Sequence, residues 1–140
     1  MSKLLILKTD GGARGNPGPA AIGVVLEDAQ GKEVKAFGRY IGETTNNQAE
    51  YRALQAGLEE AARLSATEVR CYLDSELVVK QLKLEYKVKD KELAPVFMKV
   101  WNLVQQFTKV TFTHVPREKN HRADALVNQA LDAHLAGSVK

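Results

Sequence analysis

Residues 4–19 read LLILKTDGGARGNPGP. The apolar run at residues 4–7 is typical of a buried central strand, and Asp10 followed by two glycines ends it. The residues that follow are rich in glycine and proline, which let a backbone approach a ligand or fix a turn. Their spacing matches neither the dinucleotide-binding glycine motif nor the Walker phosphate loop. The stretch therefore predicts a central strand that ends in an acidic residue and a functional loop.

Two further strands are predicted after this loop, at residues 21–26 and 34–40. A turn at residues 28–31 separates them, so the first three strands should form an antiparallel meander. From residue 47 to residue 64 the apolar residues recur at helical spacing, with Leu54 and Leu58 on one stripe. The remaining elements are expected in the order strand, two helices, strand and helix, at residues 69–73, 75–84, 92–107, 110–115 and 120–135, with Asn120 as the N-cap of the last helix.

This order predicts an α/β fold, a five-stranded mixed sheet flanked by helices and joined by right-handed crossovers. If the first three strands form a meander, the third runs parallel to the first. The helix after it then begins at the edge where the first strand ends. The two later strands, reached through helical crossovers, end at the same edge. One rim of the sheet therefore collects all these strand ends.

Acidic residues are predicted to lie together on this rim: Asp10, Glu50, Asp74 and Asp124. Each alone has an ordinary explanation as turn or helix-start chemistry, such as a capping box formed by Asn47 with Glu50. Glu50, however, lies on the buried stripe that contains Leu54. Like charges crowded on one rim repel each other and partly reprotonate unless a cation offsets them. Their convergence therefore predicts a metal site.

Oxygen-only ligands favour a hard cation such as Mg²⁺, with Mn²⁺ as a plausible substitute. Two such ions about 3.5–4 Å apart can activate water and stabilise the leaving oxygen of a phosphodiester. We therefore assign the four carboxylates as candidate metal ligands and catalytic residues, with Asp10 as the bridging ligand.

The composition narrows the remaining possibilities. The chain has 140 residues, a formal net charge of +3 and a sequence pI of about 9.0, which fit one domain over residues 1–140 and favour a polyanionic partner. Cys71 is the only cysteine, which excludes an internal disulfide and a multi-cysteine zinc site. No segment approaches the roughly 20 apolar residues that span a bilayer. A cytoplasmic protein without a membrane partner is expected.

Four motifs resemble, in order and spacing, those of type 1 ribonuclease H: TDGGARGNPGPAAIG, TTNNQAEYRAL, LDSELVVKQL and REKNHRADAL. The resemblance covers residues 4–131, and each motif contributes one of the four acidic residues. It implies the ribonuclease H-like fold and an endonuclease that hydrolyses the RNA strand of RNA–DNA hybrids with two Mg²⁺ ions. The expected products carry 5′-phosphate and 3′-hydroxyl ends. The four carboxylates match the family's metal-binding set.

The resemblance also implies further site residues. His114 matches the spacing of a family histidine thought to assist proton transfer or product release, although a strand-end histidine held by nearby backbone is an equal alternative. Other residues match positions expected to contact the hybrid: Gly11, Asn16, Thr45, Asn46 and Asn47. Amide side chains can bond the ribose 2′-hydroxyl that distinguishes RNA from DNA. Capping of the first helix by Asn46 or Asn47 is the alternative, and both roles can coexist.

The sequence departs from the family pattern at two places. Glu76 stands where many relatives carry glutamine, and an ionised carboxylate cannot donate a hydrogen bond. Residues 84–93 are short and lack the tryptophan of the family's basic protrusion, so the nearby lysines are either a replacement phosphate contact or a solvated helix face. The short form resembles a compact archaeal and bacterial branch, some of whose members accept double-stranded RNA or RNA–DNA junctions. A monomer is expected, and a non-catalytic nucleic-acid-binding module is the alternative function.

Overall fold

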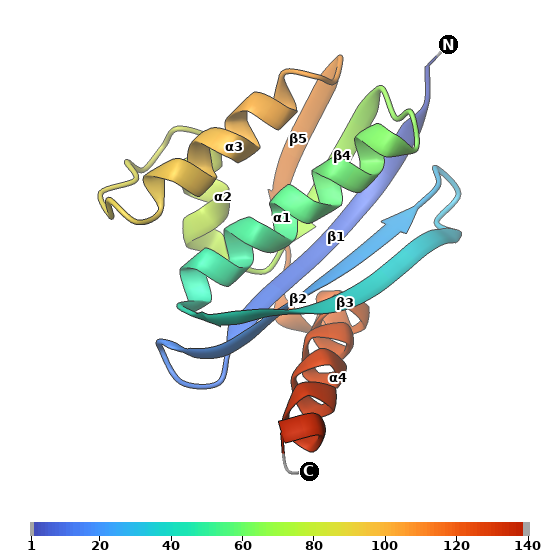
Figure 1. Cartoon of the computed structure of the whole chain (residues 1–140). Coiled ribbons are helices and arrows are strands. Elements are labelled where there is room, and N and C mark those ends of the chain that lie inside the picture. The colour runs from blue at the N-terminus through green and yellow to red at the C-terminus, as the bar shows by residue number, and fades with distance from the viewer. Residues whose placement is uncertain (1, 139–140) are drawn as a thin grey trace.

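The computed structural model describes residues 2–138. Its elements follow the predicted order (Figure 1): β1 (Leu4–Ala13), β2 (Gly18–Glu27), β3 (Glu33–Thr44), α1 (Asn46–Arg63), β4 (Glu68–Leu73), α2 (Glu76–Leu82), α3 (Ala94–Val104), β5 (Lys109–His114), a 3₁₀ turn η1 (Arg117–Asn120) and α4 (His121–Ser138). No helix among the described residues is long and apolar enough to cross a membrane.

The sheet has the strand order β3-β2-β1-β4-β5. β1, β2 and β3 pair antiparallel, while β4 pairs parallel with both β1 and β5. The predicted meander and mixed sheet are therefore confirmed.

The first three strands extend beyond the predicted ranges. β1 does not end at Asp10 but pairs with β2 as far as Ala13 opposite Ala20. β2 and β3 pair from Gly18 opposite Thr44 to Glu27 opposite Glu33, where the apolar alternation has stopped. Hydrogen bonds between main chains need no apolar side chains, so the hydrophobic pattern understates these strands.

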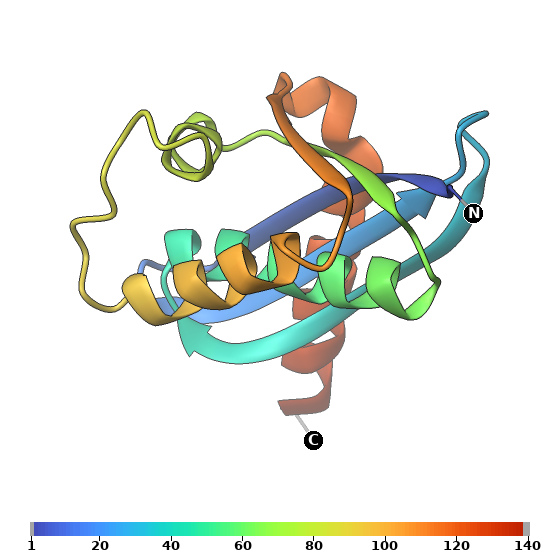
Figure 2. The same cartoon turned by 90° about the horizontal axis from the view of Figure 1, so that it is seen from above.

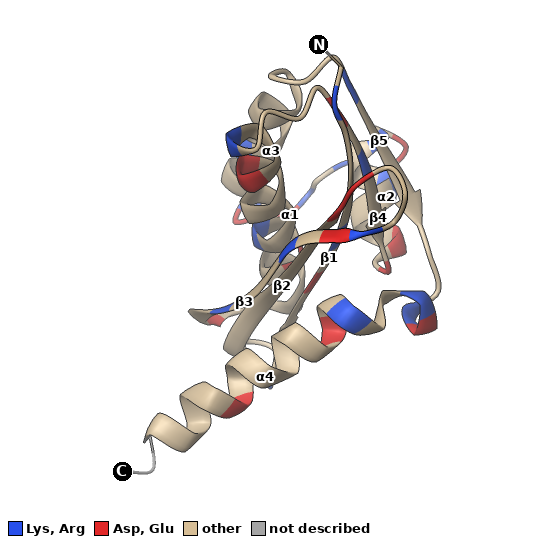
Figure 3. Cartoon of the chain, turned by 90° about the vertical axis from the view of Figure 1, so that its right-hand side faces the viewer, with Lys and Arg blue, Asp and Glu red and all other residues tan. Residues whose placement is uncertain are grey.

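The helices cover both faces of the sheet. α1 and α3 lie side by side on one face, and α4 packs on the other against β2 and β3 (Figures 1, 2 and 3). Gly23 of β2 permits this close approach, because a Cβ there would lie 2.2 Å from the Ala123 carbonyl oxygen of α4. The first turn of α4 is thereby brought to the rim where β1 ends.

The last helix begins at the predicted place, but an unpredicted turn precedes it. Residues Arg117–Asn120 form a 3₁₀ turn, and α4 begins at His121. Asn120 directly precedes α4, the predicted N-cap position, but its side-chain oxygen accepts no hydrogen bond from the described residues. Its Nδ2 donates 2.8 Å to the Thr9 carbonyl of β1. A long-range backbone acceptor therefore replaces the local capping role that the sequence pattern suggested.

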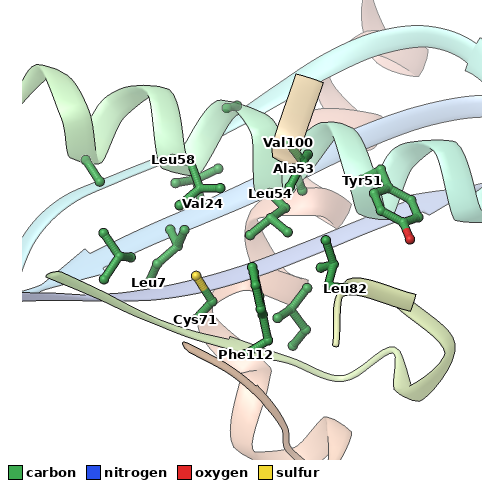
Figure 4. Packing of buried hydrophobic residues seen from close by; sticks show 14 of the residues in the cluster. Leu7, Val24, Tyr51, Ala53, Leu54, Leu58, Cys71, Leu82, Val100 and Phe112 are labelled. Carbon is green, nitrogen blue, oxygen red and sulfur yellow. The ribbon is translucent and has the colours of Figure 1, made fainter. Parts of the chain in front are cut away.

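The main core lies between α1 and the strands. Leu54 and Leu58 point from α1 toward Leu7 and Cys71 of the sheet (Figure 4), and all four side chains are buried. Tyr51 is fully buried at the edge of this cluster, and its hydroxyl donates to Gln81 Oε1 at 2.6 Å. This bond ties α1 to α2, the helix that begins two residues after Asp74.

Tyr51→Phe is expected to destabilise the protein by about 1–3 kcal/mol, because it leaves the buried Gln81 oxygen without its donor. The measurement is the free energy of unfolding in urea. Tyr40→Phe is the matched control, since the Tyr40 ring stacks on His134 and its hydroxyl makes no hydrogen bond within the described residues. Equal stability of the two variants would contradict the structural role of the Tyr51 hydroxyl.

Candidate active site

Three of the predicted carboxylates meet at the rim. Asp10 lies in β1, Asp74 directly follows β4, and Glu50 lies in the second turn of α1. Oxygen atoms from the three side chains all lie within 4.8 Å of one another. The arrangement follows from the parallel pairing of β1 with β4, which places the ends of both strands beneath the start of α1.

Asp124 lies beside these three, and its carboxyl is close enough to that of Asp10 to help raise the Asp10 pKa. It occupies the first turn of α4 and lines the same cavity, which has a volume of about 460 Å³ and also contains Asp10, Glu50 and Asp74. Its Oδ1 accepts a long hydrogen bond of 3.4 Å from Arg117 Nη2 of η1. The structure therefore brings all four carboxylates to one cavity, where Asp124 interacts with both Asp10 and Arg117.

Glu50 is the most constrained member of the set. Its side chain is buried, and Oε1 accepts a hydrogen bond of 2.6 Å from the backbone N–H of Gly11. Oε2 is also buried but has no hydrogen-bond partner within the described part of the chain. A buried carboxylate oxygen without a donor is costly, so this atom requires a cation, a proton or water.

The electrostatics of the cavity reflect this crowding. Burial and then the Asp74 carboxylate raise the pKa of Asp10 to about 7. Burial and then Asp10 raise the pKa of Glu50 well above its usual range. Burial also raises the pKa of Asp74, although the Asn120 amide and the Arg117 guanidinium partly counteract this. Without a cation, the carboxylates therefore hold protons that an isolated carboxylate would lose.

An oxygen-rich divalent-cation site fits these residues. The donors are carboxylate oxygens, one of them is orphaned and buried, and their mutual repulsion is uncompensated. Hard cations such as Mg²⁺ prefer such ligands.

Asn120 is a site residue that the sequence interpretation missed. It is buried beside the carboxylates, and through Thr9 it ties η1 to the strand that carries Asp10. Its Oδ1 has no hydrogen-bond partner among the described residues. The available signal was its position directly before the last helix and four residues before Asp124, close to the predicted rim.

The predicted substrate contacts surround the glycine loop. Asn46 Oδ1 accepts from Ala13 N at 2.8 Å, and Asn16 Oδ1 accepts from Asn46 N at 3.0 Å. Both bonds use the amide oxygens, so neither occupies the Nδ2 donors of these two exposed side chains. Asn47 lines the carboxylate cavity. The N–H of Gly11 is engaged by Glu50, which makes Gly11 a support for the carboxylate.

The cap of α1 differs from the capping box considered for Asn47 with Glu50. Thr45 is the N-cap, and its Oγ1 accepts from Gln48 N at 3.2 Å. The pattern of a hydroxyl residue followed three positions later by glutamine begins two residues earlier than the one we considered. Glu50 is consequently free of a capping role and points into the cavity.

His114 does not line the carboxylate cavity, although it pairs with Leu73, the residue before Asp74. It ends β5, is exposed, and is not among the residues that line that cavity in the described structure. It interacts with Glu76, whose pKa is lowered first by Lys80 and then by His114. Lys80 pairs with Glu76 at 3.0 Å and lies over the Tyr86 ring. One of the lysines near the short connection is thus engaged within the protein.

Comparison with known proteins identifies relatives. Residues 8–130 match the family model described as "Reverse transcriptase-like". The chain is 44% identical over 130 residues to the bifunctional protein Rv2228c of Mycobacterium tuberculosis, which covers 92% of this chain and 36% of that protein. It is 47% identical over 123 residues to ribonuclease HI of Halobacterium salinarum, and the match covers 88% of this chain and 62% of that protein. The chain therefore spans less than two thirds of the length of either relative.

A solved structure shows the same likeness. The crystal structure of LC11-RNase H1 in complex with an RNA/DNA hybrid matches with a TM-score of 0.90 at 47% identity, covering 94% of this chain and 99% of that one. Fold, motifs and relatives agree, and the chain belongs to the ribonuclease HI family in its compact form.

Proposed function

We propose that this protein is a metal-dependent endoribonuclease that hydrolyses the RNA strand of RNA–DNA hybrids, leaving 5′-phosphate and 3′-hydroxyl ends. The observation that carries the proposal is the meeting of Asp10, Glu50 and Asp74 in an open cavity, with the buried Glu50 Oε2 unsatisfied. Its relatives support it, because one is named ribonuclease HI and another was solved with an RNA/DNA hybrid.

Asp10, Glu50, Asp74 and Asp124 would hold two Mg²⁺ ions, with Mn²⁺ as a substitute. Such ions supply Lewis-acid activation of the phosphodiester and of the attacking water. The chain's own residues fix the carboxylates. The Gly11 N–H orients Glu50, while the Asn120 amide holds η1 against the end of β1. The four carboxylates would act as metal ligands and water as the nucleophile. No covalent intermediate on the protein is therefore required.

The loop residues would recognise the substrate. The Nδ2 groups of Asn16 and Asn46 can donate to ribose 2′-hydroxyls, while their oxygens keep the loop attached to α1. Thr45 and Asn47 lie beside them at the start of α1 and would contact the backbone of the hybrid. His114 would assist proton transfer or product release from its position at the end of β5.

The alternative function is a non-catalytic nucleic-acid-binding module of the same fold. The repulsion among the carboxylates weighs against it, since a module that only binds a polyanion gains nothing from a buried cluster of negative charge. The two functions differ in one measurable property, which is metal-dependent cleavage.

Incubation with labelled RNA–DNA hybrid, double-stranded RNA and double-stranded DNA is expected to show loss of only the RNA strand of the hybrid. Parallel reactions contain Mg²⁺, Mn²⁺ or a chelator, and gel electrophoresis resolves the products and their ends. The chelator should abolish cleavage, because it removes the ions that activate the phosphodiester and the attacking water. Binding of the hybrid without cleavage under either metal would favour the module, and cleavage of double-stranded RNA would extend the substrate range.

A further inference from the structure

The cavity that holds the carboxylates continues along α4. Its further lining consists of Arg14, in the loop after β1, with Val127, Asn128 and Leu131 of α4. Asp124 and Asn128 are four residues apart on α4, so one face of the helix lines both parts of the cavity. Asn128 lies about one helical turn beyond Asp124, a rise of ~6 Å. The cavity therefore offers a second contact point beside the carboxylates.

Arg14 is held in place at this second point. Its Nη1 lies 2.8 Å from Asp132 Oδ1, and its Nη2 reaches Asn128 Oδ1 at 3.5 Å. Its backbone N–H donates to the Pro19 carbonyl at 2.8 Å, which closes the loop behind it. The Arg14 side chain is 38% exposed, so the guanidinium is oriented from one side and open on the other.

The chemistry of this group suits a phosphate. A guanidinium has five N–H donors in a planar fork, and the two contacts to α4 leave donors for the two oxygens of a phosphate. Asp132 is 68% exposed, so water screens its charge and its main effect is to orient Arg14. Within the described residues, Arg117 is the other cation that lines this cavity, but it faces Asp124.

We propose that Arg14 binds a backbone phosphate of the RNA strand next to the phosphate that the carboxylates position. This inference rests on the proposed function, because it takes the substrate to be a hybrid whose RNA strand crosses the carboxylates. Arg14 is a substrate-binding residue here, and Asp132 and Asn128 are its positioning residues.

The test measures binding separately from cleavage. Fluorescence anisotropy with a labelled RNA–DNA hybrid compares Asp10→Asn with Asp10→Asn/Arg14→Ala in Mg²⁺ over a range of salt concentrations. We expect the second variant to bind about 5- to 10-fold more weakly and to lower the slope of log affinity against log salt by about one. Arg14→Lys in the same background should restore the salt slope but only part of the affinity, because lysine lacks the planar fork.

Arg63→Ala is the matched control. Arg63 is also an exposed arginine paired with a carboxylate, Glu60, but it lies at the far end of α1. Affinity and salt slope should not change in this variant. An Arg14→Ala variant that behaves like the Arg63 control would overturn the proposal.

A scan with single methylphosphonate linkages locates the contact. Neutralising one RNA phosphate next to the scissile position should weaken binding of the Asp10→Asn protein and have little effect once Arg14 is alanine. The assignment would be contradicted if neutralising the RNA phosphate still weakened binding when Arg14 is alanine. It would also be contradicted if only neutralised DNA-strand phosphates weakened binding. Because the test measures binding, it is independent of cleavage. If the wild-type protein cut no substrate but needed Arg14 to bind the hybrid, the proposed activity would be wrong and the Arg14 contact would still be supported.

Discussion

Asp10→Asn is expected to reduce hybrid cleavage by on the order of 10³-fold or more, the scale of losses when a catalytic group is removed. Asparagine keeps the shape of the side chain but removes the charge that lies among Glu50, Asp74 and Asp124. Binding of the hybrid should be largely retained, since the loop and Arg14 are untouched. Single-turnover cleavage and anisotropy on the same preparation separate the two effects.

The same substitution should stabilise the metal-free protein. The pKa of Asp10 is raised from 3.8 to about 7, so between these values the folded protein binds more protons than the unfolded chain. Stability of the metal-free protein therefore falls as pH rises from about 4 to about 7 and stays low above it. Asparagine avoids this loss, and we expect a gain of about 1–3 kcal/mol at pH 8 in chelator that disappears near pH 4.

Urea unfolding at the two pH values, with chelator and with Mg²⁺, measures this difference. Mg²⁺ should stabilise the wild-type protein more than the variant, because the variant has lost a ligand. Glu59→Gln is the control, since Glu59 is an exposed residue of α1 outside the cavity. An Asp10→Asn protein with normal cleavage would remove Asp10 from the mechanism.

The convergence of the carboxylates was predictable because it depends on topology. Once β1 to β3 form a meander and β4 follows α1, Asp10 and Asp74 must each directly follow the last residue of β1 and of β4 that pair in parallel. Glu50, near the start of α1, must then lie close to them. Hydrophobic periodicity is sufficient to establish that order of elements. These positions therefore follow from pattern without knowledge of any side-chain contact.

The supporting contacts were not predictable in the same way. The partner of Asn120 is the carbonyl of Thr9, 111 residues away, and Asp124 accepts a hydrogen bond from Arg117 at the start of the 3₁₀ turn. Both contacts depend on the path of η1 rather than on a repeating pattern. Local capping rules predicted that the Asn120 side chain would bond the start of the last helix. In the folded chain it bonds the distant Thr9 carbonyl instead.

Gly11→Ala is expected to destabilise the protein by about 3 kcal/mol or more, as overpacking against rigid backbone does. An added Cβ would lie 2.2 Å from the Ala49 carbonyl oxygen and 2.6 Å from Glu50 N, so β1 and the start of α1 must separate. That separation would also lengthen the bond from Gly11 N to Glu50 Oε1, now 2.6 Å. Metal-dependent stabilisation and cleavage should therefore be lost even in the fraction that folds.

Gly12→Ala is the matched control for stability, because the nearest atom to its added Cβ is Val127 Cγ1 at 3.8 Å, an ordinary contact. Urea unfolding should place this variant within about 1 kcal/mol of the wild-type protein, as for a substitution that neither strains backbone nor overpacks. The thermal shift on adding Mg²⁺ should remain in Gly12→Ala and vanish in Gly11→Ala. If both variants unfolded alike and responded alike to the metal, the close approach of β1 to α1 would not be what orients Glu50.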